Sequence, residues 1–255
     1  MEKSRQKIAD EGAAGKNLWY RTKSIIRHWV RVIVFAVTPI RELIEQESAS
    51  PSENKIKWDK LLSNSRFETY LGKTIRVDVT NAMTAALIKY HCIASPTVLD
   101  VGCSGGTLPP ALFSFKRYLG ADVSAHAIDV AEADTFLATD LESGRVSFKV
   151  SDLRSFDPNG YSWDVIVFNE VLYYLKCRQA LEQVQRYAES LKPNGIICIA
   201  MKNDGKSQAI FSMILRKFDW VDGMLFQQKA TKPKYSIDLS RERSAILLGV
   251  IRCKR

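Results

Sequence analysis

The sequence predicts an α/β fold: a doubly wound, Rossmann-like, mostly parallel seven-stranded sheet with a C-terminal antiparallel hairpin and an N-terminal helical extension. Between residues 97 and 202, short apolar segments of strand length alternate with segments whose apolar residues recur at helical spacing. Strands that alternate with helices are parallel and joined by right-handed crossovers, so helices are expected on both faces of the sheet. Beyond Met201, a helical segment is followed by two segments of strand character, which predict the hairpin.

The elements are expected in the following order. A helix over residues 73–94 ends before Pro96 and precedes the core. Five parallel strands follow, at TVLDVG (97–102), RYLGADV (117–123), VSFKVSD (146–152), WDVIVFN (163–169) and GIICIAM (195–201). The helices between them are expected at residues 109–115, 125–139 and 177–191, and the last segments are a helix at 206–218 and strands at 219–228 and 244–255.

The length of 255 residues suits one folded unit with an appendage. Residues 47–55, ESASPSENK, are polar and contain serine and proline, which is typical of a linker. We therefore expect an extension and linker over residues 1–54 and the main domain over residues 55–255, with its core at 97–202.

The net charge of +9 is unevenly distributed. Residues 1–41 hold nine basic and three acidic residues, residues 201–255 hold twelve and five, and the middle of the chain has a net negative charge. An anionic partner such as nucleic acid, a membrane surface or a phosphorylated substrate would therefore meet the two ends. Alternatively, the basic residues at the two ends form an ordinary solvent-exposed surface that binds no partner.

The five cysteines are scattered, without a CxxC pair and with mostly apolar neighbours. This pattern indicates reduced, buried thiols in a cytoplasmic protein, and it predicts neither a disulfide framework nor a metal site.

Residues 17–47 have the pattern of a basic amphipathic helix. Such a helix can lie at a membrane interface, which would make the protein peripheral at the inner face of the membrane, or it can pack as a lid over its own domain. Its uninterrupted apolar part, Val32–Val37, is far shorter than the roughly 20 residues that span a bilayer. The N-terminus also lacks the early apolar region of a signal peptide.

The segment VLDVGCSGGTLPPAL, residues 98–112, predicts a ligand-binding turn after the first strand. In a doubly wound sheet the ligand lies beyond the carboxyl ends of the strands. The small residues after Gly102 let a ligand approach the backbone closely. Their spacing differs from the dinucleotide fingerprint, and Asp100 places a negative charge where a pyrophosphate would lie. A nucleoside that carries an ammonium group fits this loop better.

At these residues the sequence resembles the class I S-adenosylmethionine-dependent methyltransferases. Their first motif is matched by Val98, Leu99, Asp100, Gly102 and Gly106, with Ser104 in place of the middle glycine. The resemblance extends over residues 97–202 and implies S-adenosylmethionine as the cofactor. It also implies the cofactor-binding residues, which are Asp100, Gly102, Cys103, Ser104, Gly106, Asp122, Val123, Asp152, Leu153 and Asn169.

The resemblance implies a role for each strand end. Asp122 would bind both ribose hydroxyls, Asp152 the adenine amino group, and the backbone amide of Leu153 a ring nitrogen. Asn169 and Glu170 would line the cleft under the methionine part. Asp122 and Asp152 could instead cap the helices that follow them.

The segment EVLYYL resembles the nodulation-factor N-methyltransferases and related sugar methyltransferases. It makes Glu170, Tyr173 and Tyr174 the candidate catalytic residues, with Arg66 and Tyr70 as candidate substrate-binding residues. None of the three histidines, at positions 28, 91 and 126, is expected to act as a base.

The leading hypothesis is methyl transfer to a hydroxyl or amine of a small molecule, most specifically a sugar or glycolipid-type acceptor. An RNA methyltransferase that uses the basic ends is one alternative. A non-catalytic, membrane-associated protein that binds S-adenosylmethionine is the other. The sequence alone does not identify the acceptor, because acceptor pockets of this class have no general sequence code.

Overall fold

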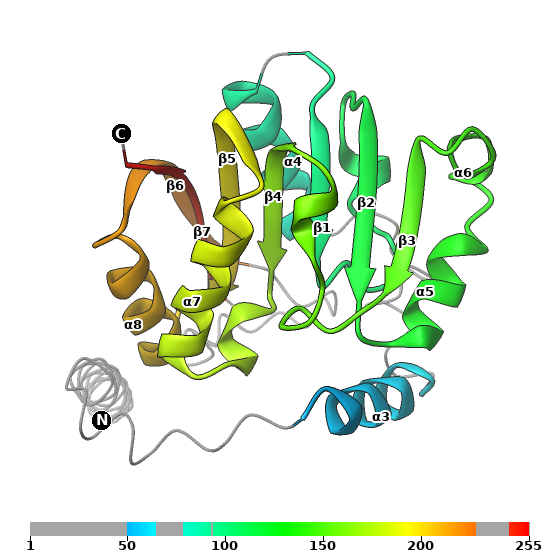
Figure 1. The fold of residues 1–255 in the computed structure, drawn as a ribbon, viewed down its shortest axis with the longest axis horizontal. Coiled ribbons are helices and arrows are strands. Elements are labelled where there is room, and N and C mark those ends of the chain that lie inside the picture. The colour runs from blue at the N-terminus through cyan, green and yellow to red at the C-terminus, as the bar shows by residue number, and fades with distance from the viewer. Residues whose placement is uncertain (1–49, 65–78, 93, 228–244, 255) are drawn as a thin grey trace, which may run out of the picture.

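The computed structural model describes residues 50–64, 79–92, 94–227 and 245–254, which form a seven-stranded sheet in the order β3-β2-β1-β4-β5-β7-β6 (Figure 1). Strands β1 to β5 are parallel, whereas β7 is antiparallel to both β5 and β6. This arrangement confirms the doubly wound sheet with its C-terminal hairpin. The strands are β1 Thr97–Val101, β2 Arg117–Asp122, β3 Val146–Val150, β4 Trp163–Asn169, β5 Leu191–Lys202, β6 Phe218–Gln227 and β7 Ala245–Cys253.

Helices cover both faces of this sheet, and each face has its own apolar core. The α-helices are α3 Pro51–Leu62, α4 Val79–His91, α5 Ala125–Glu132, α6 Ala138–Glu142, α7 Cys177–Ala188 and α8 Gly205–Ile214, and the 3-10 helices are η2 Pro109–Ala111, η3 Pro158–Gly160 and η4 Leu172–Tyr174. Helices α7 and α8 pack on one face, and α4 packs on the other.

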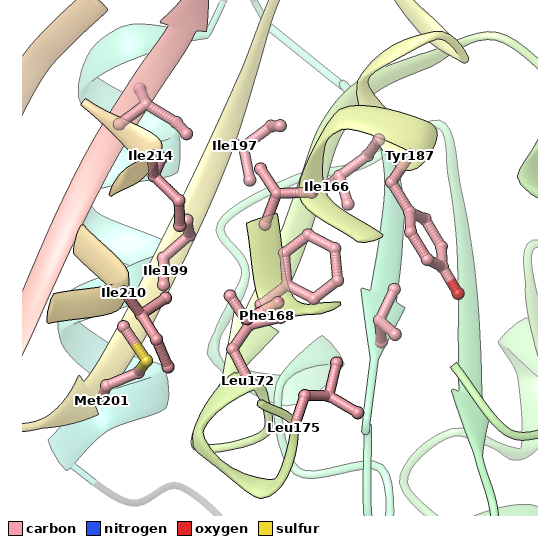
Figure 2. Packing of buried hydrophobic residues seen from close by; sticks show 14 of the residues in the cluster. Ile166, Phe168, Leu172, Leu175, Tyr187, Ile197, Ile199, Met201, Ile210 and Ile214 are labelled. Atoms are coloured by element: carbon pink, nitrogen blue, oxygen red, sulfur yellow. The ribbon is translucent and has the colours of Figure 1, made fainter. Parts of the chain in front are cut away.

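Strand β4 shows how the sequence builds both cores. Ile166 and Phe168 point toward α7 and α8, where Figure 2 shows them beside Ile197 and Tyr187. Val167 belongs to the core on the α4 side. Successive side chains of a strand point to opposite faces, so a strand buried on both faces is apolar throughout, as this one is.

Residues 51–55 are helical, so the expected linker over residues 47–55 is wrong from Pro51 onward. The hydroxyl of Ser50 accepts a hydrogen bond from the Glu53 backbone at 3.2 Å, and the Glu53 carboxylate accepts one from the Ser50 backbone at 2.8 Å. This capping box, with Pro51 at the first helical position, starts α3. The boundary expected at residue 54 therefore lies inside a helix.

Two expected helices are shorter than their apolar patterns indicated. The segment 109–115 forms only the 3-10 turn η2. The segment 125–139 divides into α5 and α6, because the Asp134 carboxylate accepts a hydrogen bond from the Phe136 backbone at 2.9 Å and holds a turn between them.

The described cysteines are free thiols. Cys103, Cys177 and Cys198 are buried as expected, and burial raises the pKa of Cys92 to about 11. Cys253 is exposed and lies at the C-terminal end of β7. Among the described residues, none of the helices has the length and apolar character needed to cross a membrane.

Candidate functional site

The loop after β1 is bound directly to the neighbouring strand. The backbone N–H groups of Gly102 and Cys103 donate to the Ala121 carbonyl at 2.7 and 3.2 Å. Gly102, Ser104 and Gly106 all have positive φ, at 80°, 49° and 72°. Left-handed backbone of this kind is inexpensive only for glycine, so this sharply wound loop depends on its small residues.

At Gly106 the loop lies too close to neighbouring side chains for a residue with a Cβ atom. A Cβ atom at this position would lie 2.8 Å from the Phe148 ring and 2.9 Å from the Cβ of Ala131. The loop backbone therefore packs directly against β3 and α5.

Asp122 ends β2 and holds the loop through its carboxylate. One oxygen accepts the Ser104 N–H at 2.9 Å, and the other accepts the Ser124 N–H at 2.9 Å. Burial, with a smaller contribution from Asp59, raises the pKa of Asp122 despite these hydrogen bonds. A carboxylate has about four acceptor positions, so each oxygen keeps capacity for a ligand hydroxyl.

Asp122 does not cap the helix that follows it. Ser124 caps α5 instead, because its hydroxyl accepts a hydrogen bond from the Ala127 N–H at 3.2 Å.

Asp100 lies in β1 directly before the loop and is buried. The hydroxyl of Tyr118 in β2 donates to its carboxylate at 2.7 Å. A buried carboxylate behind a loop of small residues attracts a cationic group strongly, because little water screens its charge.

Asp152 follows β3 and forms a two-pronged ion pair with Arg154. Its Oδ1 accepts from the Arg154 Nε at 2.9 Å and from the Arg154 backbone at 2.8 Å, while its Oδ2 accepts from Nη2 at 2.8 Å. Burial alone would raise the pKa of this carboxyl, but the bonds from Arg154, together with one from Asn54, hold it below its ordinary value. The carboxylate caps a turn at residues 152–155, since no α-helix follows β3 directly.

Leu153, beside it, is fixed through its carbonyl, which accepts from the Tyr187 hydroxyl at 2.9 Å and from Arg186 at 2.5 Å. Arg186 and Tyr187 of α7 thus fix the backbone at Leu153, whose amide is expected to bind a ring nitrogen of adenine.

At the end of β4, a polar network joins Asn169 to helix α4. The Asn169 amide donates to Asn81 at 2.9 Å and accepts from the Thr84 hydroxyl at 3.3 Å. Asn81 in turn donates to the Thr107 hydroxyl, at the end of the loop after β1, at 2.7 Å. Asn81 and Thr84 were not foreseen as site residues, although polar residues on the buried face of an apolar helix are a signal that sequence inspection could have used.

Glu170, the next residue, has a φ of 56°, an uncommon conformation for a residue with a side chain. Its backbone N–H donates to the Ala200 carbonyl at 2.8 Å. Its carboxylate accepts from the Tyr173 hydroxyl at 3.0 Å. Burial, followed by the nearby Glu170 charge, raises the pKa of Tyr173, so its phenol remains protonated and acts as a donor.

Tyr174 extends this group into an aromatic surface. Its ring centroid lies 4.6 Å from that of Tyr173 and 5.0 Å from that of Trp58 in α3. The ammonium group of Lys202 lies 5.5 Å from the Tyr173 ring.

Helix α3 contributes Trp58 because it lies along the carboxyl edge of the sheet, beyond the arrowheads of β2 and β3 in Figure 1. Its Asp59 accepts from the Ser124 hydroxyl at 2.7 Å and from the His126 backbone at 3.3 Å. With the bond from Asn54 to Asp152, α3 contacts the segments that follow β2, β3 and β4. His126 thus lies near the start of α5, as expected. The candidate residues Arg66 and Tyr70, and the segment 17–47, lie outside the described residues.

The carboxyl edge of this sheet therefore combines a tightly wound glycine loop with polar side chains at the ends of β1, β2, β3 and β4. A doubly wound α/β protein of this design binds a nucleoside-containing ligand across the edge.

Comparisons with known proteins agree. Residues 99–197 match the family model described as a methyltransferase domain. These residues form a class I S-adenosylmethionine-dependent methyltransferase domain, which confirms the resemblance recognised from the motif after β1. S-adenosylmethionine is the cofactor of this class of domain.

A curated relative, the ubiquinone biosynthesis O-methyltransferase of Rickettsia typhi, is 28% identical over 146 residues, which are 52% of this chain and 53% of the relative. The chain thus matches only about half the length of that relative.

Two solved structures share the fold. The N-methyltransferase NodS from Bradyrhizobium japonicum WM9 has a TM-score of 0.53 at 18% identity, over 69% of this chain and 94% of its own. The magnesium protoporphyrin IX methyltransferase from Synechocystis PCC 6803 has a TM-score of 0.53 at 14% identity, over 82% of this chain and all of its own.

Proposed function

We propose that this chain transfers a methyl group from S-adenosylmethionine to a hydroxyl or amine of a small molecule, with a sugar or glycolipid-type compound as the specific candidate. The observation that carries the proposal is the arrangement of Asp122. Its carboxylate holds the loop after β1 through Ser104 and keeps capacity for two ligand hydroxyls, as a ribose would require.

The other residues at the edge fit the remaining parts of the cofactor. The buried Asp100 suits the ammonium group, and Asp152 with the Leu153 amide suits the adenine edge. Gly102 and Gly106 let the loop wind tightly against Val171, Phe148 and Ala131, which would leave its backbone accessible to the cofactor. Bound S-adenosylmethionine supplies the methyl group on a sulfonium, so the protein needs to supply positioning and charge rather than a covalent intermediate.

Glu170 would serve the acceptor. A hydroxyl or a protonated amine must lose a proton during methyl transfer, and a carboxylate at the end of β4 can accept it. The Tyr173 hydroxyl, 3.0 Å from that carboxylate, would orient it. Glu170 has a positive φ, a strained conformation of the kind that is often found at functional sites.

The aromatic surface of Trp58 and Tyr174 supports a ring-shaped acceptor. Aromatic faces stack on the apolar face of a sugar and equally on an aromatic ring. A phenolic hydroxyl is therefore the second candidate, and the similarity to a ubiquinone biosynthesis O-methyltransferase supports it. The likeness of the EVLYYL segment to NodS-type sequences supports an amino sugar.

The first experiment is calorimetric titration of the chain with S-adenosylmethionine and with S-adenosylhomocysteine. Wild type is expected to bind both, and Asp122→Ala is expected to lose at least tenfold in affinity. Asp129→Ala removes an exposed acid of nearby α5 and serves as the matched control, with unchanged affinity. Absence of binding by the wild-type chain would contradict the proposal.

The second experiment uses S-adenosylmethionine with a labelled methyl group and three acceptor panels: amino sugars and glycolipids, phenols, and single-stranded RNA. Label is expected in the first or second panel, with turnover at saturating acceptor reduced about 10²–10⁴-fold in Glu170→Gln, the usual contribution of a general base. Glu182→Gln, on the surface of α7, is the control. Methylation of RNA alone would overturn the acceptor proposal while leaving the cofactor assignment intact.

A further inference from the structure

A hollow lies at the edge of the sheet opposite the candidate site, where the parallel strands begin. Its volume is about 550 Å³. It is bounded by Thr97 at the start of β1, Arg117 at the start of β2, Arg145 just before β3, and Trp163 at the start of β4. Because the loops that form the methyltransferase site follow the other ends of these strands, this hollow is separate from that site.

The described residues that line the hollow include three cations and no carboxylate. The cations are Lys116, Arg117 and Arg145. Arg145 donates to the Asp140 carboxylate through Nε at 2.7 Å and also through Nη2, so its charge is largely compensated. Lys116 is exposed, and within the described chain neither Lys116 nor Arg117 forms an ion pair. The hollow therefore keeps a net positive charge.

Arg117 is held in place without being neutralised. Its guanidinium carbon lies 3.8 Å from the centroid of the Tyr161 ring, so the ring fixes the guanidinium plane. Its Nε is buried, and in the described part of the chain it has no hydrogen-bond acceptor. A buried donor of this kind costs free energy unless a partner is bound. The stacking on Tyr161 holds this guanidinium, which has no ion pair among the described residues, at the wall of the hollow.

Arg145 is oriented in a similar way, with its guanidinium carbon 4.8 Å from the centroid of the Phe115 ring. Ser143 and Ser162 add hydroxyl groups to the lining. The uncompensated Arg117 guanidinium, the Lys116 ammonium, the remaining N–H groups of Arg145 and the neighbouring hydroxyls together match the charge and hydrogen-bonding needs of a phosphate.

We propose that this hollow binds the phosphoryl group of a small phosphorylated molecule. The volume is much larger than a bare phosphate needs and lies within the range of small-molecule pockets, so the hollow has room for the group that carries the phosphate. The exposed Tyr161 ring is available to contact that group. The proposal is independent of methyl transfer, because it concerns residues at the opposite edge of the sheet.

The test is calorimetric titration of the full chain with inorganic pyrophosphate as the probe. Wild type is expected to bind it, with affinity that falls as salt is added, since exposed charges are screened. The double variant Lys116→Gln/Arg145→Gln is expected to lose at least tenfold in affinity. Arg178→Gln, which removes one exposed cation of α7 at the other edge, is the control and is expected to bind as wild type does.

Two further measurements distinguish the outcomes. Thermal melting followed by circular dichroism reports whether the double variant folds. If the double variant does not fold, the single variant Lys116→Gln, which changes an exposed side chain, takes its place. Its affinity for pyrophosphate is expected to fall about threefold. Titration with a single-stranded 12-nucleotide RNA tests the polymeric source of phosphate. Absence of pyrophosphate binding, equal binding by the double variant and wild type, or binding of the RNA alone would each overturn the proposal. S-adenosylmethionine binding is expected to be unchanged in the variants.

Discussion

The Asp122 carboxylate accepts a hydrogen bond from the Ser104 backbone at 2.9 Å, so the residue that ends β2 holds the loop that follows β1. Ser104 has a φ of 49°, which is unfavourable for a residue with a side chain. One carboxylate therefore holds the strained loop, and under the proposed function it would also accept hydrogen bonds from the ligand. The shape of the loop and the affinity for the cofactor are expected to change together when either residue is altered.

Substitutions at Ser104 test this relationship. Ser104→Gly keeps the backbone donor and removes the conformational cost, so the free energy of unfolding is expected to stay within about 1 kcal/mol of wild type. Ser104→Val places a β-branched side chain at positive φ and is expected to destabilise the protein by more than 1 kcal/mol, with weaker binding of S-adenosylmethionine. Urea unfolding and calorimetry measure both effects. Equal stability of the two variants would contradict this account.

A pair of glycine substitutions separates backbone strain from crowding. Gly106 and Gly144 both have positive φ, at 72° and 69°. A Cβ atom at Gly106 meets Phe148 and Ala131, whereas one at Gly144 meets no atom within 4 Å. Gly106→Ala is therefore expected to lower the free energy of unfolding by about 1–3 kcal/mol more than Gly144→Ala does. Urea unfolding of both variants gives the difference, and a difference near zero would show that the loop can move away.

The buried hydrogen bond from Tyr118 to Asp100 gives a third prediction. Tyr118→Phe keeps the ring and removes the donor from a buried carboxylate, so a loss of about 1–3 kcal/mol in the free energy of unfolding is expected. Tyr161→Phe is the control, because Tyr161 is 49% exposed and its loss of a hydroxyl leaves no buried carboxylate without a donor. If both variants unfold at the same urea concentration as wild type, the bond between Tyr118 and Asp100 contributes little.

Asn81 is expected to act as a positioning residue for Asn169. Asn81→Ala removes the acceptor of the Asn169 amide and the donor to Thr107, so α4 loses this bond to the loop and one of its two bonds to Asn169, the other being donated by Thr84. We expect weaker binding of S-adenosylmethionine by about three- to tenfold. Asn81→Asp, which keeps the acceptor for Asn169, is expected to recover part of this loss. A purely structural role would lower the melting temperature of Asn81→Ala and leave the affinity of the folded protein unchanged.

Strand ends could be predicted from the sequence because apolar strands that finish in an acid or an amide are rare and local signals. Asp122 and Asn169 are the last residues of β2 and β4, Asp152 follows β3, and all three lie at or just beyond the carboxyl edge. The loop after β1 was recognisable for the same reason, since its small residues are consecutive.

Contacts between distant segments could not be predicted in this way. The partners Asn81 and Asn169 are 88 residues apart, and Asp59 lies 65 residues from Ser124. Such pairings depend on how helices pack on the sheet, for which a single sequence carries no local pattern. Helix α3 was missed although its capping box was present, because the polar residues around Pro51 suggested a linker.

The last prediction concerns acid stability and the ion pair of Asp164. Its carboxylate accepts from the Lys192 ammonium at 2.7 Å and from the Thr97 backbone at 2.8 Å. Burial alone would raise its pKa, but these bonds hold the pKa of Asp164 below its ordinary value. An acid with a lowered folded-state pKa stabilises the protein above its unfolded pKa, near 4, and loses that contribution as the pH falls through its folded pKa.

Asp164→Asn is therefore expected to be less stable than wild type at pH 7, by about 1 kcal/mol because the pair is partly exposed to solvent. The difference between the two proteins should shrink as the pH falls below about 4, where wild type also loses the charge. Urea unfolding from pH 7 down to pH 3 measures it, with Asp129→Asn on the exposed surface of α5 as the control. If the difference in free energy of unfolding between wild type and Asp164→Asn stays constant over this range, the ion pair with Lys192 contributes no pH-dependent stability. The hydrogen bond from Thr97 would then survive in either protonation state of Asp164.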